Sequence, residues 1–258
     1  MTKKEPVIFV GHGSSLNAIG DNPYRTEWKK IGKYLGKPKV IIAFSAHWFK
    51  EDLYVRTADF NKQINDMYGF PDELYQVHYE PKGSPDYAKR VLDLLGDSAE
   101  ENNDWGIDHG VWSVLSNMYP DADIPVVMIS VNVNLSSEKQ FEIGKKLRSL
   151  REEGALILAS GNIVHNLTMV DWRLDDTYDW AKKFNNEIKD AILNGDYDKV
   201  VNYENIENYN LAIPTTEHFI PLLNVLGLIS SSDKLIIFND KGELGSISMT
   251  SFLFEDSS

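Results

Sequence analysis

Short runs of apolar, largely β-branched residues constrain this chain more than any other feature of its sequence. The four strongest runs lie at residues 7–10, 40–44, 125–131 and 156–159. They are apolar almost throughout and lack the polar–apolar alternation of a strand with one wet face. Strands with helices on both faces show this pattern, so we expect these runs to form the centre of a covered sheet. Weaker strand patterns lie at residues 53–57, 235–238 and 246–252.

Longer segments with the spacing of amphipathic helices separate these runs. The predicted helices cover residues 24–35, 85–95, 111–118, 137–150, 180–193 and 216–226. Two long stretches, 60–85 and 194–213, lack a clear period, and such loops in a compact domain are usually lids or binding loops. No internal repeat or Pro/Gly/Ser-rich linker divides the chain. We therefore expect one α/β domain over residues 1–258, with a central mostly parallel or mixed β-sheet flanked by helices on both faces.

Composition narrows the partners and the ligand chemistry. The 258 residues include 26 Lys and Arg against 39 Asp and Glu, a formal charge of −13. This charge disfavours nucleic acid and anionic membranes as partners. No apolar segment approaches the roughly 20 residues of a membrane-spanning helix, and no leader segment is recognisable, so we expect a cytoplasmic protein. Cysteine is absent, which leaves His, Asp and Glu as the residues able to bind a metal ion.

Three of the six histidines closely follow predicted central strands. His12 comes one glycine after the first strand, His47 three residues after the second, and His165 a few residues after the run at 156–159. Each stands among small residues, which leave room for a ligand. Open α/β sheets bind ligands at the carboxyl ends of their strands. One such histidine is as often structural as functional, but three at equivalent positions predict a metal site.

The other three histidines have less local support. His218 follows Glu217 in the predicted first turn of a helix, where spacing alone does not distinguish it from an ordinary surface histidine. His109 stands beside Asp108 in a glycine-flanked loop, where a general acid or base could be exposed. The sequence supports a structural role and a functional role for His109 equally. His78 has no special neighbours and is expected to be peripheral.

Eight short segments, in order over nearly the whole chain, resemble motifs of the class III (LigB-like) extradiol ring-cleaving dioxygenases, in particular their DOPA-dioxygenase-type branch. They are Gly11-His12-Gly13-Ser14, Ser45-Ala46-His47-Trp48, Gly69-Phe70-Pro71, Trp105-Gly106-Ile107-Asp108-His109-Gly110, Met118-Tyr119-Pro120-Asp121-Ala122-Asp123-Ile124-Pro125, Ser160-Gly161-Asn162-Ile163-Val164-His165-Asn166-Leu167, Thr216-Glu217-His218 and Gly245-Ser246-Ile247-Ser248-Met249. Each segment alone is weak evidence, but the eight together are specific.

The resemblance implies a single α/β domain that binds one mononuclear metal ion and inserts both atoms of O₂ into a catechol. His12, His47 and His218 match the metal ligands of the family. His165 matches the active-site histidine, which acts as acid and base and can join the metal as a fourth ligand. His109 falls in a further active-site motif, where it would assist with protons or substrate.

The chain departs from the family pattern at a few positions. Ser15 and Thr216 stand where proline is frequent, and neither change removes a ligand. Class III enzymes often use a carboxylate as the third ligand, whereas His218 occupies that position here, next to Glu217. This fits the DOPA-type branch and departs from the two-histidine, one-carboxylate pattern of ferrous oxygenases.

Fe(II) is the metal expected for activity, and Zn²⁺ would also fill such a site in purified protein, because imidazole binds it readily. Two other functions compete with the dioxygenase. A zinc-dependent hydrolase would use metal-bound water as its nucleophile and need no O₂. A tetrapyrrole metal chelatase would also use converging histidines, but it explains the later motifs poorly.

The substrate is open among DOPA, a protocatechuate-like acid and other small aromatic diols. Tyr68, Phe70, Tyr75 and Trp112 could line an aromatic pocket, although such side chains are more often part of the core. No motif indicates an oligomeric state.

Overall fold

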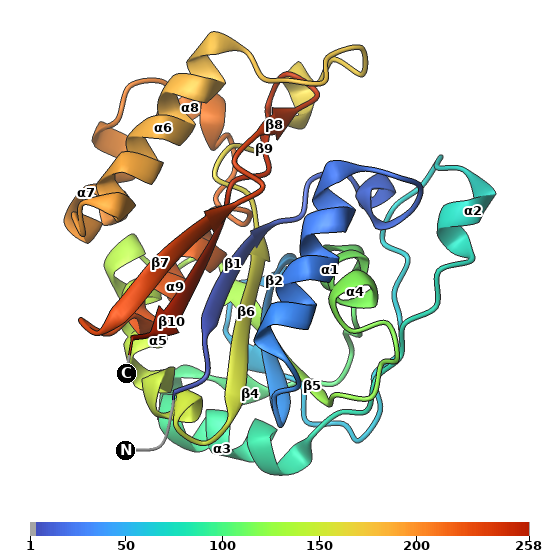
Figure 1. The fold of residues 1–258 in the computed structure, drawn as a ribbon. Coiled ribbons are helices and arrows are strands. Elements are labelled where there is room, and N and C mark those ends of the chain that lie inside the picture. The colour runs from blue at the N-terminus through green and yellow to red at the C-terminus, as the bar shows by residue number, and fades with distance from the viewer. Residues whose placement is uncertain (1–3, 258) are drawn as a thin grey trace.

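The computed structural model describes residues 4–257 and contains an eight-stranded mixed sheet (Figure 1). Four parallel strands form its centre, in the order β5 (Val126–Asn132), β2 (Val40–Lys50), β6 (Ala155–Gly161) and β1 (Val7–Gly11). They correspond to the four strongest apolar runs. The prediction of a central mostly parallel or mixed sheet is confirmed.

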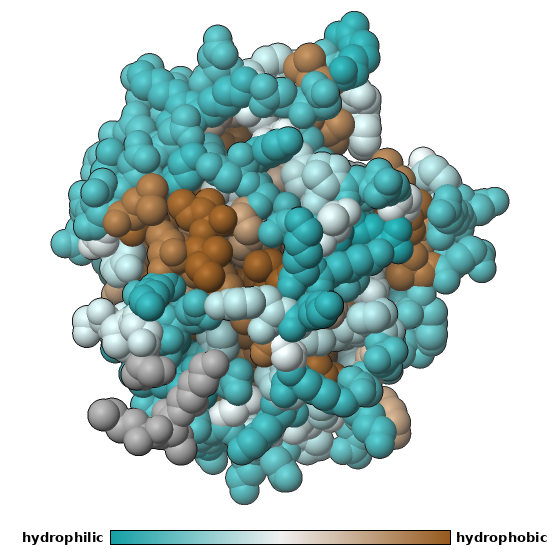
Figure 2. Space-filling view, viewed as in Figure 1, coloured by the Kyte–Doolittle hydropathy of each residue, from teal (hydrophilic) through white to brown (hydrophobic). Residues whose placement is uncertain are grey.

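Antiparallel pairing occurs toward both edges of this sheet. β10 (Ser251–Asp256) pairs with β1 and with the edge strand β7 (Asp233–Phe238). On the other side, β3 (Tyr54–Val55) is antiparallel to β5 and pairs with β4 (Glu100–Glu101). Figure 2 shows hydrophobic side chains gathered over β7 and β10, and most apolar residues of β7 are only partly buried. The helices therefore leave this edge of the sheet less covered than its centre.

Helices cover both faces of the sheet, as the sequence predicts. α1 (Pro23–Leu35) and α4 (His109–Met118) lie together on one face (Figure 1). Neighbouring residues of β1 alternate between two cores, with Ile8 on the α1 and α4 side and Phe9 on the other. The helices of that second face are α3 (Pro85–Leu95), α5 (Ser137–Leu147), α6 (Asp179–Leu193) and α9 (Ile220–Leu228).

Shorter elements connect these layers. They are α2 (Asp72–Tyr75), α7 (Tyr197–Val201), α8 (Tyr209–Ala212), the 3₁₀ turns Ser15–Ala18, Gly96–Ser98, Arg148–Arg151, Leu167–Met169 and Tyr203–Asn205, and the paired strands β8 (Gly242–Glu243) and β9 (Ile247–Ser248). The stretch at 194–213 is thus partly helical, because helices of one turn are too short to show a period. Within residues 4–257, no helix is both long and apolar enough to cross a membrane.

Two predicted strand boundaries are wrong. β2 continues to Lys50 instead of ending at residue 44, with a register shift between Phe44 and Phe49 in its pairing with β5. The polar residues after position 44 interrupt the apolar run without ending the strand. The strand predicted at 246–252 is divided between β9 and β10.

Two helix starts also differ from the prediction. α4 begins at His109, with Asp108 as its N-cap, so His109 is not in a loop. α9 begins at Ile220 rather than at residue 216. Pro221 lies in its first turn, the position where proline fits a helix best. Pro214, which suggested the earlier start, precedes an irregular turn.

Candidate metal centre

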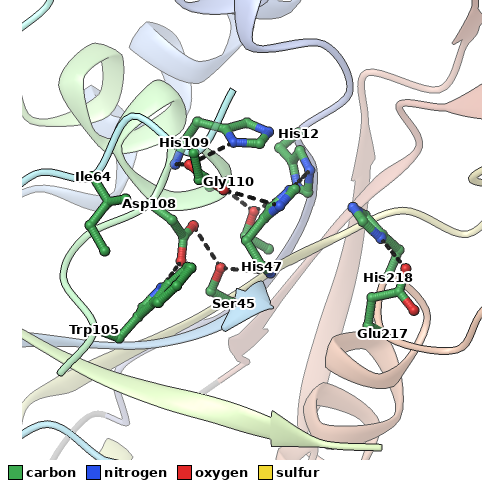
Figure 3. A network of polar contacts seen from close by, with 12 residues as sticks. His12, Ser45, His47, Ile64, Trp105, Asp108, His109, Gly110, Glu217 and His218 are labelled. Carbon is green, nitrogen blue, oxygen red and sulfur yellow. Dashed lines mark hydrogen bonds and ion pairs between the residues drawn. The ribbon is translucent and has the colours of Figure 1, made fainter. Parts of the chain in front are cut away.

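Five histidines gather at the carboxyl edge of the central strands, and Figure 3 shows four of them, His12, His47, His109 and His218. His12 follows β1, His47 lies inside β2 near its carboxyl end, and His165 lies four residues beyond β6. His109 opens α4, and His218 stands in the turn before α9. The sixth, His78, has a side chain that is 75% exposed and lies beside Glu80. The sequence therefore located the histidine cluster and set His78 apart correctly.

Two glycines let the elements that carry these histidines approach one another. A Cβ on Gly110 would lie 2.8 Å from Cδ2 of His47, so the start of α4 packs directly against that ring. A Cβ on Gly161 would lie 2.2 Å from the carbonyl oxygen of His218. That oxygen accepts a hydrogen bond from the backbone of Asn162. The end of β6 thus fixes the backbone of His218.

The rings of His12, His47 and His218 form a nearly equilateral triangle. Their centroids are 5.0 Å apart for His12 and His47, 5.3 Å for His12 and His218, and 5.0 Å for His47 and His218. One ion bound about 2.1 Å from a nitrogen of each ring would place the ring centres roughly 5 Å apart. The triangle therefore has the size of a three-imidazole metal site.

Hydrogen bonds behind the rings fix which nitrogen of each is available. Nδ1 of His12 lies 2.9 Å from Oγ of Ser160, and that hydroxyl donates its own hydrogen to the carbonyl of Gly110. His12 must therefore donate from Nδ1, which leaves Nε2 with a free lone pair. Nδ1 of His47 lies 3.3 Å from a carboxylate oxygen of Asp66, which favours the same tautomer.

His218 repeats this arrangement from the opposite side. Its Nδ1 lies 3.1 Å from Oε1 of Glu217, while its Nε2 is buried without a hydrogen-bond partner. Figure 3 shows the ring turned toward His12 and His47. A buried polar atom without a partner is costly, and metal binding is one common resolution.

The Nε2 atoms of His12 and His47 lie 3.1 Å apart. If both carry lone pairs, as their Nδ1 partners indicate, the two atoms repel each other unless a cation lies near both. Burial, together with the neighbouring imidazoles, lowers the pKa of His12, of His47 and of His218 well below the ordinary value, so the rings are neutral. Neutral converging imidazoles fit a borderline metal ion such as Fe(II) or Zn²⁺.

Asp66 is a carboxylate of this site that contacts two histidines. One oxygen accepts a hydrogen bond from the backbone nitrogen of His109 and lies 2.9 Å from Nδ1 of that ring. The other oxygen faces His47. Burial by itself raises the pKa of Asp66, but the hydrogen bonds of His109 and the electrostatic interaction with the His109 and His47 rings lower it below the ordinary value. Asp66 therefore remains an anion behind both rings.

The tightest groups of donor atoms differ from the predicted triad. Donor atoms within 4.8 Å of one another occur in the set His12, His47 and His109 and in the set His165, Glu217 and His218. His109 is thus a geometric competitor for the place of His218. The buried Nε2 of His218 has no hydrogen-bond partner, and this favours His218 as the ligand. The contact of His109 Nδ1 with Asp66 does not separate the two candidates, because Nδ1 of His47 makes the same contact.

His165 stacks on His218, with ring centroids 3.5 Å apart and planes 9° from parallel. Because the lone pair of an imidazole nitrogen lies in the ring plane, two stacked rings do not direct lone pairs at the same ion. Burial, and then the charge of His109, lowers the pKa of His165 to about 4. The ring is therefore a neutral group at the cavity wall.

Sequence reasoning missed the carboxylate of Asp66 and assigned no role to that of Asp108. Asp66 lies in the aperiodic stretch at 60–85, near the Gly69-Phe70-Pro71 segment, and these were the only signals pointing to it. Asp108 is fully buried and accepts hydrogen bonds from Ser45 and Trp105. Burial, with the nearby charge of Asp66, raises the pKa of Asp108 to about 6. This residue connects β2 to the start of α4.

A cavity of about 500 Å³ lies over the histidines. All five histidines line it, together with Asp66, Glu217 and a group of apolar residues. Of the four aromatic candidates, Tyr68 and Phe70 line this cavity, whereas Trp112 is fully buried in the core and Tyr75 packs beside it. The volume is within the ~300–1,000 Å³ of small-molecule sites.

Comparison with known families agrees with this site. The model of the family described as the catalytic LigB subunit of aromatic ring-opening dioxygenase matches residues 10–251. This match covers most of the chain, and the protein therefore belongs to that family. The resemblance seen in the sequence is confirmed, and the hydrolase and chelatase alternatives lose their support.

Individual relatives show which kind of ring-opening dioxygenase the chain resembles. The chain is 42% identical over 252 residues to 4,5-DOPA dioxygenase extradiol of Escherichia coli strain K12, covering 95% of this chain and 93% of the relative. It is 36% identical over 257 residues to the protein of the same name from Beta vulgaris, covering 96% and 95%. A crystal structure of an uncharacterized Escherichia coli K12 protein shares the fold, with a TM-score of 0.85, 39% identity and coverage of 97% and 99%. The chain is thus an extradiol ring-cleaving dioxygenase, an oxidoreductase with a mononuclear metal site.

Proposed function

We propose that this protein opens the ring of a catechol with O₂, and that His12, His47 and His218 hold the metal ion of the reaction. The observation that carries the assignment is the convergence of three rings whose Nδ1 atoms each face an acceptor. Their Nε2 atoms are then left free on the inner side. Since the donors are all neutral imidazoles, the site suits Fe(II).

Fe(II), when bound, would supply coordination positions for the catechol oxygens and O₂ and a route for electrons between them. Because Zn²⁺ has no redox chemistry, we propose Fe(II) as the working ion even where zinc fills the same nitrogens.

His165 is the residue that we propose as acid and base. Its ring lines the cavity and is neutral, because burial lowers its pKa to about 4. A neutral ring nitrogen can accept the proton of a catechol hydroxyl and later return it to the opening product. The parallel stacking of His165 on His218 supports this role rather than that of a fourth metal ligand.

His109 is the second residue for which we propose a role in proton handling. It lines the cavity, and its ring centroid is 3.9 Å from that of His47. Asp66 accepts a hydrogen bond from the backbone nitrogen of His109 and lies 2.9 Å from Nδ1 of the His109 ring. The carboxylate of Asp66 would therefore stabilise a protonated His109 ring. A proton could thus pass from substrate to His109 without leaving an uncompensated charge.

The substrate that we propose is a small aromatic diol. The names of the relatives support a catechol of the DOPA type, with O₂ as co-substrate. The apolar wall of the cavity would exclude water from the ring once the substrate is seated. We also propose that residues 1–258 form a single catalytic domain, which the family match over residues 10–251 supports.

Anaerobic loading with Fe(II), followed by a panel of catechols in an oxygen electrode, tests this function. We expect O₂ uptake with formation of a yellow semialdehyde, and none from the zinc-loaded protein. His165→Ala should keep its bound iron and lose turnover by roughly 10²–10⁴-fold, the usual share of a general acid–base residue. His78→Ala is the matched control, since that ring is exposed and outside the site. If the iron-loaded protein consumes no O₂ with any catechol, the proposal is wrong.

A further inference from the structure

Glu243 is a buried carboxylate that contacts the loop after His12 without lining the cavity. It is the last residue of β8 and is only 9% exposed. We propose that Glu243 is a positioning residue of the metal centre, which fixes His12 by accepting hydrogen bonds from the loop that follows it. This inference rests on the proposed role of His12 as a metal ligand and adds a residue to which the sequence gave no pointer.

The Oε1 atom of Glu243 accepts two hydrogen bonds from this loop. The backbone nitrogen of Ser14 and Nδ2 of Asn17 each donate to it over 2.9 Å. Nδ2 of Asn17 also lies 3.2 Å from Oε2. Within residues 4–257, no cationic side chain pairs with this carboxylate. Glu243 therefore acts as an acceptor for the loop and not as half of an ion pair.

The loop and the carboxylate are in direct contact, and Gly13 allows this approach. Gly13 has a φ of +58°, and a Cβ at this position would lie 2.4 Å from Oε1 of Glu243 and 2.2 Å from Sδ of Met249. The positive φ and the lack of space both require glycine. The backbone between His12 and Ser14 therefore has little freedom while Glu243 stays in place.

His12 is held from a second direction by the end of β6. Its backbone nitrogen donates to the carbonyl of Gly161 over 3.2 Å, and its Nδ1 contacts the hydroxyl of Ser160. Glu243 adds a contact on the other side of His12, through Ser14. Such outer partners orient a metal ligand and tune its affinity. Loss of the Glu243 contact would free one side of His12 and allow its Nε2 to turn away from the ion.

The hairpin that carries Glu243 also holds the segment of His165. Figure 1 shows β8 and β9 beyond the carboxyl end of β1. His165 forms an isolated β-bridge with Ile247 of β9, and the backbone nitrogen of Ser248 donates to the carbonyl of Val164. The hairpin thus contacts the chain after β1 through Glu243 and the chain after β6 through β9. It therefore relates the position of His12 to that of His165.

Two substitutions at position 243 separate hydrogen bonding from charge. Glu243→Ala removes the acceptor of Ser14 and Asn17 and should weaken metal binding by about 10–100-fold, the usual effect of losing an outer partner of a ligand. Glu243→Gln keeps an acceptor oxygen and removes only the charge, so it should bind the metal nearly as tightly as the native protein. Competition with a chromophoric chelator for Zn²⁺ measures both affinities.

Bound Co²⁺ gives a second readout that a purely structural role would not change, because its absorption bands depend on the arrangement of its ligands. We expect shifted bands in Glu243→Ala and native bands in Glu243→Gln. Asp233→Asn is the control, since Asp233 is a buried carboxylate that pairs with Arg151 and does not line the cavity. This variant should be less stable than the native protein but keep its Zn²⁺ affinity and its Co²⁺ bands.

The outcomes separate this inference from the proposed function. Native affinity and native Co²⁺ bands in Glu243→Ala would overturn the positioning role. An equal loss of affinity in Glu243→Gln would also overturn it, since charge rather than hydrogen bonding would then control metal binding. An equal loss in Asp233→Asn would do the same, because lower stability would explain the effect. If His12→Ala binds Zn²⁺ as tightly as the native protein, the proposed ligand set itself is wrong.

Discussion

Polar groups are buried at both ends of the central parallel strands, but they differ in whether they have partners. The amino edge is the end where these strands begin, and the carboxyl edge is the end where they stop. At the amino edge, Arg151 is fully buried, and its guanidinium donates to the carbonyls of Glu5 and Leu228 and to both carboxylate oxygens of Asp233. At the carboxyl edge, His218 has a buried Nε2 without a partner. The buried guanidinium at the first edge therefore has protein partners, whereas the buried nitrogen at the second edge is available for a ligand.

Helix α9 joins these two environments. It starts directly after the turn that carries His218 and ends at Leu228, whose carbonyl accepts from Arg151. Its residues are buried along the whole length. The amino edge thus anchors one end of the helix, and the other end presents a histidine to the cavity. We infer from the comparison that stability is concentrated at one edge and reactivity at the other.

The largest effect is expected at the amino edge. Arg151→Ala would leave Asp233 buried without its partner, and such losses cost about 3–5 kcal/mol. Denaturant unfolding of the metal-free protein measures this free energy. Arg173→Ala, which breaks an exposed arginine–aspartate pair, should cost about 0–1 kcal/mol. If the two variants lost similar amounts of unfolding free energy, the buried ion pair would contribute no more to stability than the exposed one, and this prediction would be wrong.

The next effect lies at the carboxyl edge and should appear in metal affinity instead of stability. His218→Ala removes one of three proposed ligands and should weaken metal binding by roughly 10²–10³-fold. This estimate assigns one ligand a quarter of the ~10–16 kcal/mol with which a four-ligand site binds zinc. Competition with a chromophoric chelator measures it. Unfolding of the metal-free form should be little destabilised, since the variant removes a buried nitrogen without a partner. Unchanged affinity would exclude His218 as a ligand and favour His109.

A smaller effect is expected from the carboxylate behind the rings. Asp66→Asn keeps the shape but removes the charge that faces His47 and His109, and such changes cost about 10–100-fold in metal affinity or activity. Asp66→Glu should recover part of the loss. The measurement is chelator competition beside kcat. An Asp66→Asn protein with full affinity and full kcat would show that the carboxylate only fixes the loop.

The smallest effect is a pH dependence of stability at the amino edge. Although burial alone raises the pKa of Asp233, the hydrogen bond and charge of Arg151 lower it below the ordinary value. The stabilisation from this carboxylate is therefore complete above the unfolded pKa of about 3.9 and is lost as the pH falls through the folded pKa. Asp233→Asn should be less stable than the native protein at neutral pH, and the difference should shrink in acid. A difference that is constant with pH would contradict this role.

Much of the site could be predicted because it follows from local pattern. Apolar runs located the central strands, and His12 and His165 stand after two of them. Asp66 could not be found in this way, because its contacts with His47 and His109 join residues 19 and 43 positions apart. The strand end at residue 44 was misplaced because the polar residues Ser45 and His47 interrupt the apolar run, although the strand itself continues to Lys50.

Residue types and their order along the chain were enough to predict the class of fold, the edge of the sheet where the histidines gather and the absence of thiolate ligands. These depend on residue type and on the order of short segments, which remain the same in any conformation. Only the folded structure shows which nitrogen of each imidazole is free and which carboxylate stands behind it. Those properties arise from hydrogen bonds and burial between residues far apart in the chain, which exist only after the chain has folded.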